Sequence, residues 1–162
     1  PAVEEALKFD SKIIVEAGIL GREIECSVLG NEHGKVSLPG EIVPSNEFYD
    51  YSAKYMDNKS RLIIPAQLPQ IVTERARELA LEAFRAVDAQ GLARVDMFVK
   101  SDGTLYLNEI NTMPGFTAIS MYPKLWEASG LKGPDLVNKL IELGLARHWG
   151  RSRLQHKRQE GS

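Results

Sequence analysis

The sequence of 162 residues predicts an α+β fold in which helices cover a mostly antiparallel sheet. Three observations predict this. Strand-like segments come in groups and do not alternate regularly with helices. Two of these segments flank Asp102-Gly103, and an amphipathic helix precedes them. Asp-Gly between two alternating runs is a strong signal for a hairpin, whose strands are antiparallel.

The first half of the chain supplies short strands. Residues 1–9 suit the end of a helix. Residues 22–29 alternate, with Ile24 and Cys26 on one face and Glu23 and Glu25 on the other. Residues 44–69 are irregular, and long loops of this kind are often functional. We expect strands at 12–16, 22–29, 35–38 and 41–43.

The second half begins with the clearest helix, predicted over residues 71–90. Its apolar residues recur at helical spacing, and Gly91 is expected to end it. Two strands follow, at 92–100 and 104–111, and then two shorter helices, at 123–128 and 135–146.

The hairpin carries a candidate metal site. If Asp102-Gly103 is a two-residue turn, Asp96 faces Glu109 and Arg94 faces Asn111. Side chains that face each other across a strand pair have Cβ atoms about 4.5–5.5 Å apart. Carboxylate and amide oxygens are ligands for Mg²⁺ or Mn²⁺, and Arg94 suits a phosphate or a developing oxyanion. A solvated strand face is the alternative.

The segment from 111 to 120 is small and polar, and it leads into a helix. Gly115 allows the backbone to approach a ligand closely. Amides near a helix start favour an anion such as a carboxylate. An ordinary loop between strand and helix is the alternative.

Composition and charge exclude several classes of protein. With 43% hydrophobic residues the chain can bury a core, and it has no apolar run long enough for a membrane span. A net charge of −2 is not typical of a domain that binds nucleic acid. The lone Cys26 fits a reducing, cytoplasmic location, and the first residues do not form a signal peptide. Residues 147–162 carry five basic residues and one acidic residue, and we expect a flexible tail.

Several motifs resemble one enzyme family. GLARVD at 91–96 and LNEINTMPGFT at 107–117 are similar to motifs of the D-alanine–D-alanine ligases, which belong to the ATP-grasp superfamily. EAGILGRE at 16–23, FYDYSAKY at 48–55 and SMYPKLW at 120–126 match further motifs in the same order. The resemblance implies that residues 23–146 are an ATP-grasp C-terminal domain. It also implies that residues 1–22 are the end of the central ATP-grasp subdomain.

The resemblance implies roles for individual residues. Asp96, Glu109 and Asn111 would coordinate two Mg²⁺ (or Mn²⁺) ions on the ATP phosphates. Arg94 and the Gly115 amide would stabilise the tetrahedral intermediate. The remaining roles are nucleotide binding by Glu16, Glu23 and Lys54, binding of the second D-alanine by Ser120 and Met121, and closure of an active-site loop that contains Tyr55.

The reaction so implied joins two D-alanines through an acyl phosphate, for peptidoglycan precursors. The chain is similar to the C-terminal half of such an enzyme and lacks the lysines and glycine-rich loop of the other half. We therefore expect it to need a missing N-terminal half and to be inactive alone; a homodimer is left open. Another ATP-grasp carboxylate–amine ligase and a non-catalytic binding module are the alternatives.

Overall fold

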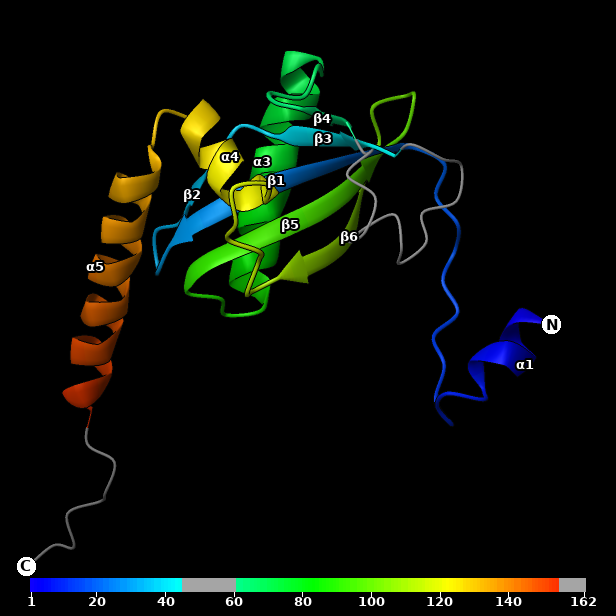
Figure 1. Ribbon diagram of the computed structural model, residues 1–162, viewed down its shortest axis with the longest axis horizontal. Coiled ribbons are helices and arrows are strands. Elements are labelled where there is room, and N and C mark those ends of the chain that lie inside the picture. The colour runs from blue at the N-terminus through cyan, green and yellow to red at the C-terminus, as the bar shows by residue number, and fades with distance from the viewer. Residues whose placement is uncertain (45–60, 155–162) are drawn as a thin grey trace, which may run out of the picture.

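The computed structural model describes residues 1–44 and 61–154, and its centre is an antiparallel sheet (Figure 1). The strands lie in the order β4-β3-β1-β5-β6, and β2 pairs with β1. This confirms the predicted α+β class. The elements are α1 (Ala2–Ala6), β1 (Arg22–Gly30), β2 (Lys35–Val36), β3 (Gly40–Val43), β4 (Arg61–Ile63), α3 (Gln70–Ala86), β5 (Gly91–Val99), β6 (Leu105–Asn111), α4 (Met121–Ala128) and α5 (Gly133–Ser152).

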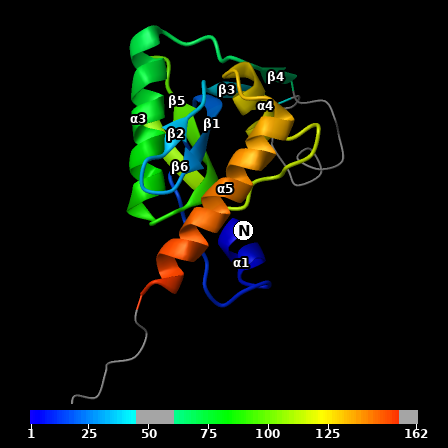
Figure 2. The same cartoon turned by 90° about the vertical axis from the view of Figure 1, so that its left-hand side faces the viewer.

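Helices cover the two faces of the sheet unequally. α3 lies along one face, and α4 and α5 lie on the other (Figures 1 and 2). Beneath α3, alternate residues of β1 and β5 form the main core with the apolar stripe of the helix; its members include Ile24, Val95 and Phe84. On the opposite face, Tyr122 and Trp126 pack with one end of β1, so the rest of that face is left for polar side chains.

The β1–β5 pair lies in the middle of the sheet. Their register runs without interruption from Arg22–Val99 to Gly30–Gly91. Ile24 and Val95 point toward α3, and side chains alternate across a strand. The register therefore places Glu25 of β1 beside Asp96 of β5 on the opposite face. The acidic residues predicted on that face of 22–29 therefore meet the polar residues of β5.

The hairpin differs from its predicted form at the turn. The amide of Gly103 donates to Lys100 O and the amide of Lys100 donates to Thr104 O, which closes a loop of three residues, not two. Gly103, at φ 85°, adopts the left-handed conformation that this loop needs. A β-bulge between Asp96 and Met97 then shifts the register back. Asp96 thus pairs with Glu109 as predicted.

The end of α3 also differs from the prediction. The helix stops at Ala86, and Gly91 is the first residue of β5. Asp88, at φ 50°, occupies the position after the helix that glycine often takes, and the amide of Ala89 donates to Phe84 O. This is a Schellman motif, in which the last carbonyls accept hydrogen bonds from the departing chain. Asp tolerates the left-handed conformation better than most residues, which explains the earlier stop.

The predicted strand at 12–16 is wrong. Residues 12–20 have no regular structure, and the side chains of Ile14 and Val15 are exposed. No strand of the described residues pairs with this segment, so its backbone has no ladder of hydrogen bonds to join. α1 lies apart from the sheet and buries none of its residues (Figure 1).

The remaining differences are a longer final helix and one additional strand. α5 continues past Ala146 to Ser152, so residues 147–152 are helical and are not part of a flexible tail. β4 falls inside the range 44–69 that the sequence predicted to be irregular. Within the described part of the chain, no helix is long and apolar enough to cross a membrane.

Candidate functional site

Three adjacent strands line up two rows of polar side chains on the face opposite α3. In the first row, Glu25 of β1 pairs with Asp96 of β5, which pairs with Glu109 of β6. In the next row, Ser27 pairs with Arg94, which pairs with Asn111. The strand order therefore places three carboxylates side by side, with one guanidinium among them.

Arg94 binds both inner carboxylates. Its Nε donates to Asp96 Oδ1 at 2.8 Å and its Nη2 donates to Asp96 Oδ2 at 2.8 Å, a bidentate pair. The same Nε lies 3.1 Å from Glu25 Oε2. Glu25 and Asp96 are only 2% and 3% exposed, so this is a buried cluster of charges.

The pKa of Arg94 is raised well above its ordinary value. Burial alone would lower this pKa, but the hydrogen bonds to Asp96 and the negative charges of Glu25, Asp96 and Glu109 outweigh it. Arg94 is therefore a permanent cation. A permanent cation held by two carboxylates keeps a fixed position on this face of the sheet.

The donor chemistry of the neighbouring oxygens fits Mg²⁺ or Mn²⁺. Asp96, Glu109 and Asn111 offer two carboxylates and one amide oxygen from adjacent positions of the hairpin. Glu109 is exposed, and Asn111 Oδ1 accepts a hydrogen bond from the Met113 amide at 3.1 Å. Among the residues that the structure describes, no three His, Cys, Asp or Glu side chains form a ready-made cage. Such a partial set suits Mg²⁺, which usually completes its shell with water and phosphate oxygens.

The loop after β6 packs tightly at its glycine. A Cβ atom on Gly115 would lie 2.9 Å from Ser120 Oγ, which is too close for any other residue without a shift. Ser120 Oγ accepts a hydrogen bond from the Thr117 amide at 3.0 Å, and Ser120 precedes the first turn of α4. The Met121 side chain is buried, so only the backbone of Met121 is available at this helix start.

The other predicted site residues lie elsewhere. Glu23 is half-buried near the start of β1, and Glu16 is exposed in the segment that leads to β1. The arrangement therefore does not bring Glu16 into the Arg94 cluster. Lys54 and Tyr55 lie outside the described residues.

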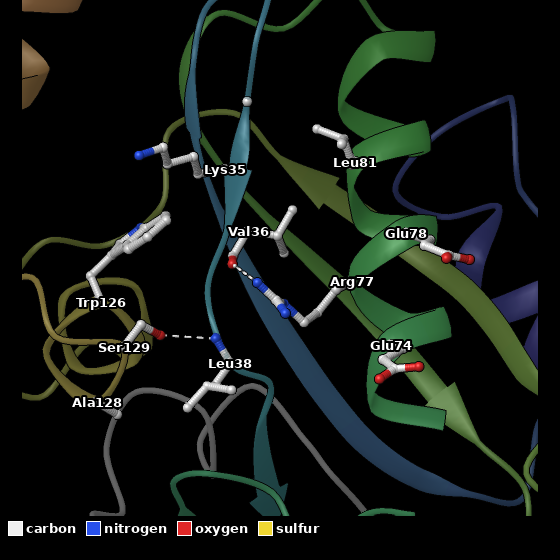
Figure 3. A pocket seen from close by; sticks show the side chains of 11 residues that line it. Lys35, Val36, Leu38, Glu74, Arg77, Glu78, Leu81, Trp126, Ala128 and Ser129 are labelled. Atoms are coloured by element: carbon white, nitrogen blue, oxygen red, sulfur yellow. Dashed lines mark hydrogen bonds between the residues drawn. The ribbon is translucent and has the colours of Figure 1, made fainter. Parts of the chain in front are cut away.

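A pocket of about 750 Å³ is found away from these residues (Figure 3). It lies between β2, α3 and α4, and its lining includes none of the predicted site residues. Arg77 crosses it to donate to Val36 O at 2.9 Å, and Ser129 Oγ accepts from the Leu38 amide at 2.9 Å (Figure 3). These two bonds join the elements around the pocket, and because none of the predicted site residues lines it, we do not place the chemistry here.

Comparison with known proteins decides the family. The family model described as D-ala D-ala ligase C-terminus matches residues 1–142. The chain belongs to this family. A D-alanine--D-alanine ligase of Halothermothrix orenii is 61% identical over 144 residues, which are 89% of this chain and 42% of that protein. The chain thus spans less than half the length of this relative.

Solved structures of ligases share the fold. The D-alanine-D-alanine ligase of Coxiella burnetii superposes with a TM-score of 0.82 at 45% identity, over 94% of this chain and 40% of that one. A Bacillus anthracis ligase complexed with ATP superposes with a TM-score of 0.76 at 34% identity, over 93% of this chain and 48% of that one. The ligase fold confirms the resemblance that the motifs indicated.

One member of the cluster in this ligase domain had not been predicted as a site residue from the sequence. Glu25 was placed on the polar face of its strand but was given no role. The alternation at 22–29 was the available signal, yet only the β1–β5 register shows that Glu25 lies opposite Asp96. That pairing joins strands far apart in the sequence, so no local pattern reports it.

Proposed function

We propose that this chain is the C-terminal part of an ATP-dependent ligase that joins two D-alanines to D-alanyl-D-alanine, a peptidoglycan precursor. One observation carries the proposal within this family: Arg94, Asp96, Glu109 and Asn111 occupy paired positions on the face of the sheet opposite α3. Metal ions held by the two carboxylates and the amide oxygen would balance the charge of a triphosphate, and Arg94 would balance that of a developing oxyanion.

The metal-facing residues would be Asp96, Glu109 and Asn111, holding two Mg²⁺ or Mn²⁺ ions. When bound, these ions supply neutralisation of the ATP phosphates. Arg94 stays charged and is held by Asp96 and Glu25, so it is positioned to stabilise the oxyanion of the tetrahedral intermediate. The Gly115 backbone amide would be a second donor.

Substrate and nucleotide would be bound at opposite ends of this face. Ser120 and the Met121 amide, at the start of α4, suit the carboxylate of the second D-alanine. Glu23 would bind the ATP ribose, and Glu16 would lie at the hinge beside the adenine. Lys54 would reach the phosphates, and Tyr55 would belong to the loop that closes over the reactants.

The reaction that these residues serve is activation of an acyl group. The carboxylate of the first D-alanine attacks the γ-phosphate of ATP, giving an acyl phosphate and ADP. The amine of the second D-alanine then displaces phosphate. Both steps need positioning and charge neutralisation more than a protein nucleophile. We place this ligase in the cytoplasm, with the missing N-terminal half as its partner.

The test is an assay of the complete ligase that contains these residues. With ATP, Mg²⁺ and D-alanine it should release phosphate and D-alanyl-D-alanine in equal amounts. Asp96→Asn should abolish both products, whereas Glu41→Gln, at a carboxylate paired with Arg22 away from the cluster, should keep them. Phosphate release without dipeptide, or full activity of Asp96→Asn, would contradict the proposal.

The 162-residue chain by itself should show no turnover in the same assay. Loss of one well-placed donor to a transition state costs about 10²–10³ in rate. The opposing phosphate-binding lysines and the site for the first D-alanine are absent from this sequence, so several such losses add together. Turnover close to that of the complete ligase would show that this chain carries the whole site.

A further inference from the structure

Arg94 lies between two buried carboxylates, of which only one belongs to the proposed metal site. The Arg94 guanidinium donates two hydrogen bonds to the Asp96 carboxylate, each at 2.8 Å. Glu25 approaches the same Nε from the neighbouring strand at 3.1 Å. The side chain of Arg94 is 19% exposed and that of Glu25 is 3% exposed, so little water is available to balance their charges.

A divalent cation at Asp96 changes this balance. A carboxylate has lone pairs for a hydrogen bond and a metal at once, but its single negative charge cannot neutralise both a guanidinium and a divalent cation. Without a second carboxylate, Arg94 would be repelled by the ion that its partner holds. Glu25 supplies that second charge at a distance that needs no rearrangement of the backbone.

We propose that Glu25 is a positioning residue, which takes over Arg94 when Asp96 binds the metal ion. This inference rests on the proposed function. The Nε hydrogen bond shifts from Asp96 Oδ1 to Glu25 Oε2, so Arg94 keeps a carboxylate partner and its place above the sheet. Asp96 is then released to face the metal. Glu25 acts through Arg94 and is not itself a ligand.

The fold makes Glu25 suitable for this role. It lies in the middle of the uninterrupted β1–β5 ladder, directly opposite Asp96 and diagonal to Arg94. A central position in a paired strand fixes its Cβ, whereas Glu109 lies beyond the bulge on an exposed strand. Of the two carboxylates that hold Arg94, Asp96 adjoins Glu109 of the proposed metal site, whereas Glu25 lies on the far side of Asp96 from it.

The test measures Mn²⁺ binding by electron paramagnetic resonance in the complete ligase with saturating ADP. Glu25→Gln keeps the shape of the side chain and removes its charge, and it should raise the Kd for Mn²⁺ about 10-fold, the lower end of the effect of residues that support metal ligands. Glu41→Gln is the control, because it removes the charge of another largely buried carboxylate that contacts an arginine of the same sheet. It should change the Kd less than about twofold.

A double-mutant cycle separates action through Arg94 from a direct effect of charge. In an Arg94→Met background, Glu25→Gln should no longer change the Kd for Mn²⁺. If Arg94→Met does not fold, Arg94→Gln replaces it, because glutamine keeps a polar side chain beside the carboxylates but carries no charge. A merely structural role would lower the melting temperature of Glu25→Gln and leave the Kd unchanged.

The outcomes distinguish two failures. If Glu25→Gln leaves the Kd unchanged, or if its effect persists without Arg94, the positioning role is overturned while the metal site stands. Asp96→Asn serves as the reference: an unchanged Kd in that variant would overturn the proposed metal site, and this inference with it.

Discussion

Removing the Arg94 side chain should destabilise the domain more than removing any other arginine whose contacts are described. Arg94→Met keeps a long apolar side chain but leaves Asp96 and Glu25 facing each other with no cation between them. Breaking a buried pair by deleting one partner typically costs about 3–5 kcal/mol. Because a domain is stable by only about 5–15 kcal/mol, this is a large fraction of its stability.

Arg22→Met provides the comparison. Arg22 makes the same two-pronged contact with Glu41, but its side chain is 41% exposed against 19% for Arg94. Water screens such a pair, so we expect a loss of about 1 kcal/mol, the upper value for exposed pairs. Arg94→Met should also lower the melting temperature by roughly 10 °C, at about 2–4 °C per kcal/mol for a domain of this size.

The assay is urea unfolding of the chain followed by far-ultraviolet circular dichroism, with equal slopes required before midpoints are compared. Added Mg²⁺ should stabilise Arg94→Met more than the parent chain, because a bound cation replaces the lost positive charge. The reasoning is refuted if Arg94→Met costs no more than Arg22→Met, or if Mg²⁺ stabilises both chains equally.

Three further predictions follow from the same structure. Asp96→Asn and Glu109→Gln should each weaken Mg²⁺-dependent nucleotide binding of the complete ligase in a calorimetric titration. The double variant should lose less binding free energy than the sum of the two single losses, because both residues act on one ion cluster. Phe84→Ala should cost about 3–5 kcal/mol in urea unfolding and Val87→Ala less than about 0.5 kcal/mol, since Phe84 is buried and Val87 is half exposed. Burial raises the pKa of Cys26 from 9.0 to about 12. The folded chain should therefore resist a thiol reagent at mildly alkaline pH and react in urea, and its stability should fall as pH rises above about 9, because the unfolded thiol loses its proton first.

The sequence predicted the pairing of Asp96 with Glu109 from an incorrect turn. A two-residue turn at Asp102-Gly103 would give this pairing in a regular hairpin. The structure has a loop one residue longer and a bulge that restores the register, and the two differences cancel. Local chemistry identified the position of the turn but not its length, and bulges depend on cross-strand packing that a single strand does not reveal.

The remaining predictions were correct where the pattern lies within one segment and failed where they depended on pairing between distant strands. The stripe that includes Phe84 was identified because helix periodicity is written within one segment. Glu25 was missed because its neighbours belong to a strand far along the chain. The segment 12–16 has the composition of a buried strand, but a strand forms only where a partner offers hydrogen bonds, and composition does not report the partner.

The bulge between Asp96 and Met97 divides the hairpin into two segments whose strands pair in different registers. On the tip side, Met97 to Val99 pair with β6 in the register that the three-residue loop sets; on the other side, Asp96 and Arg94 pair with Glu109 and Asn111 in the shifted register. A residue inserted at the loop can be absorbed at the bulge without moving Glu109 from its place opposite Asp96. The tip is therefore the position at which a tag or a probe could be grafted into this ligase domain while the face that carries Asp96 and Glu109 keeps its alignment.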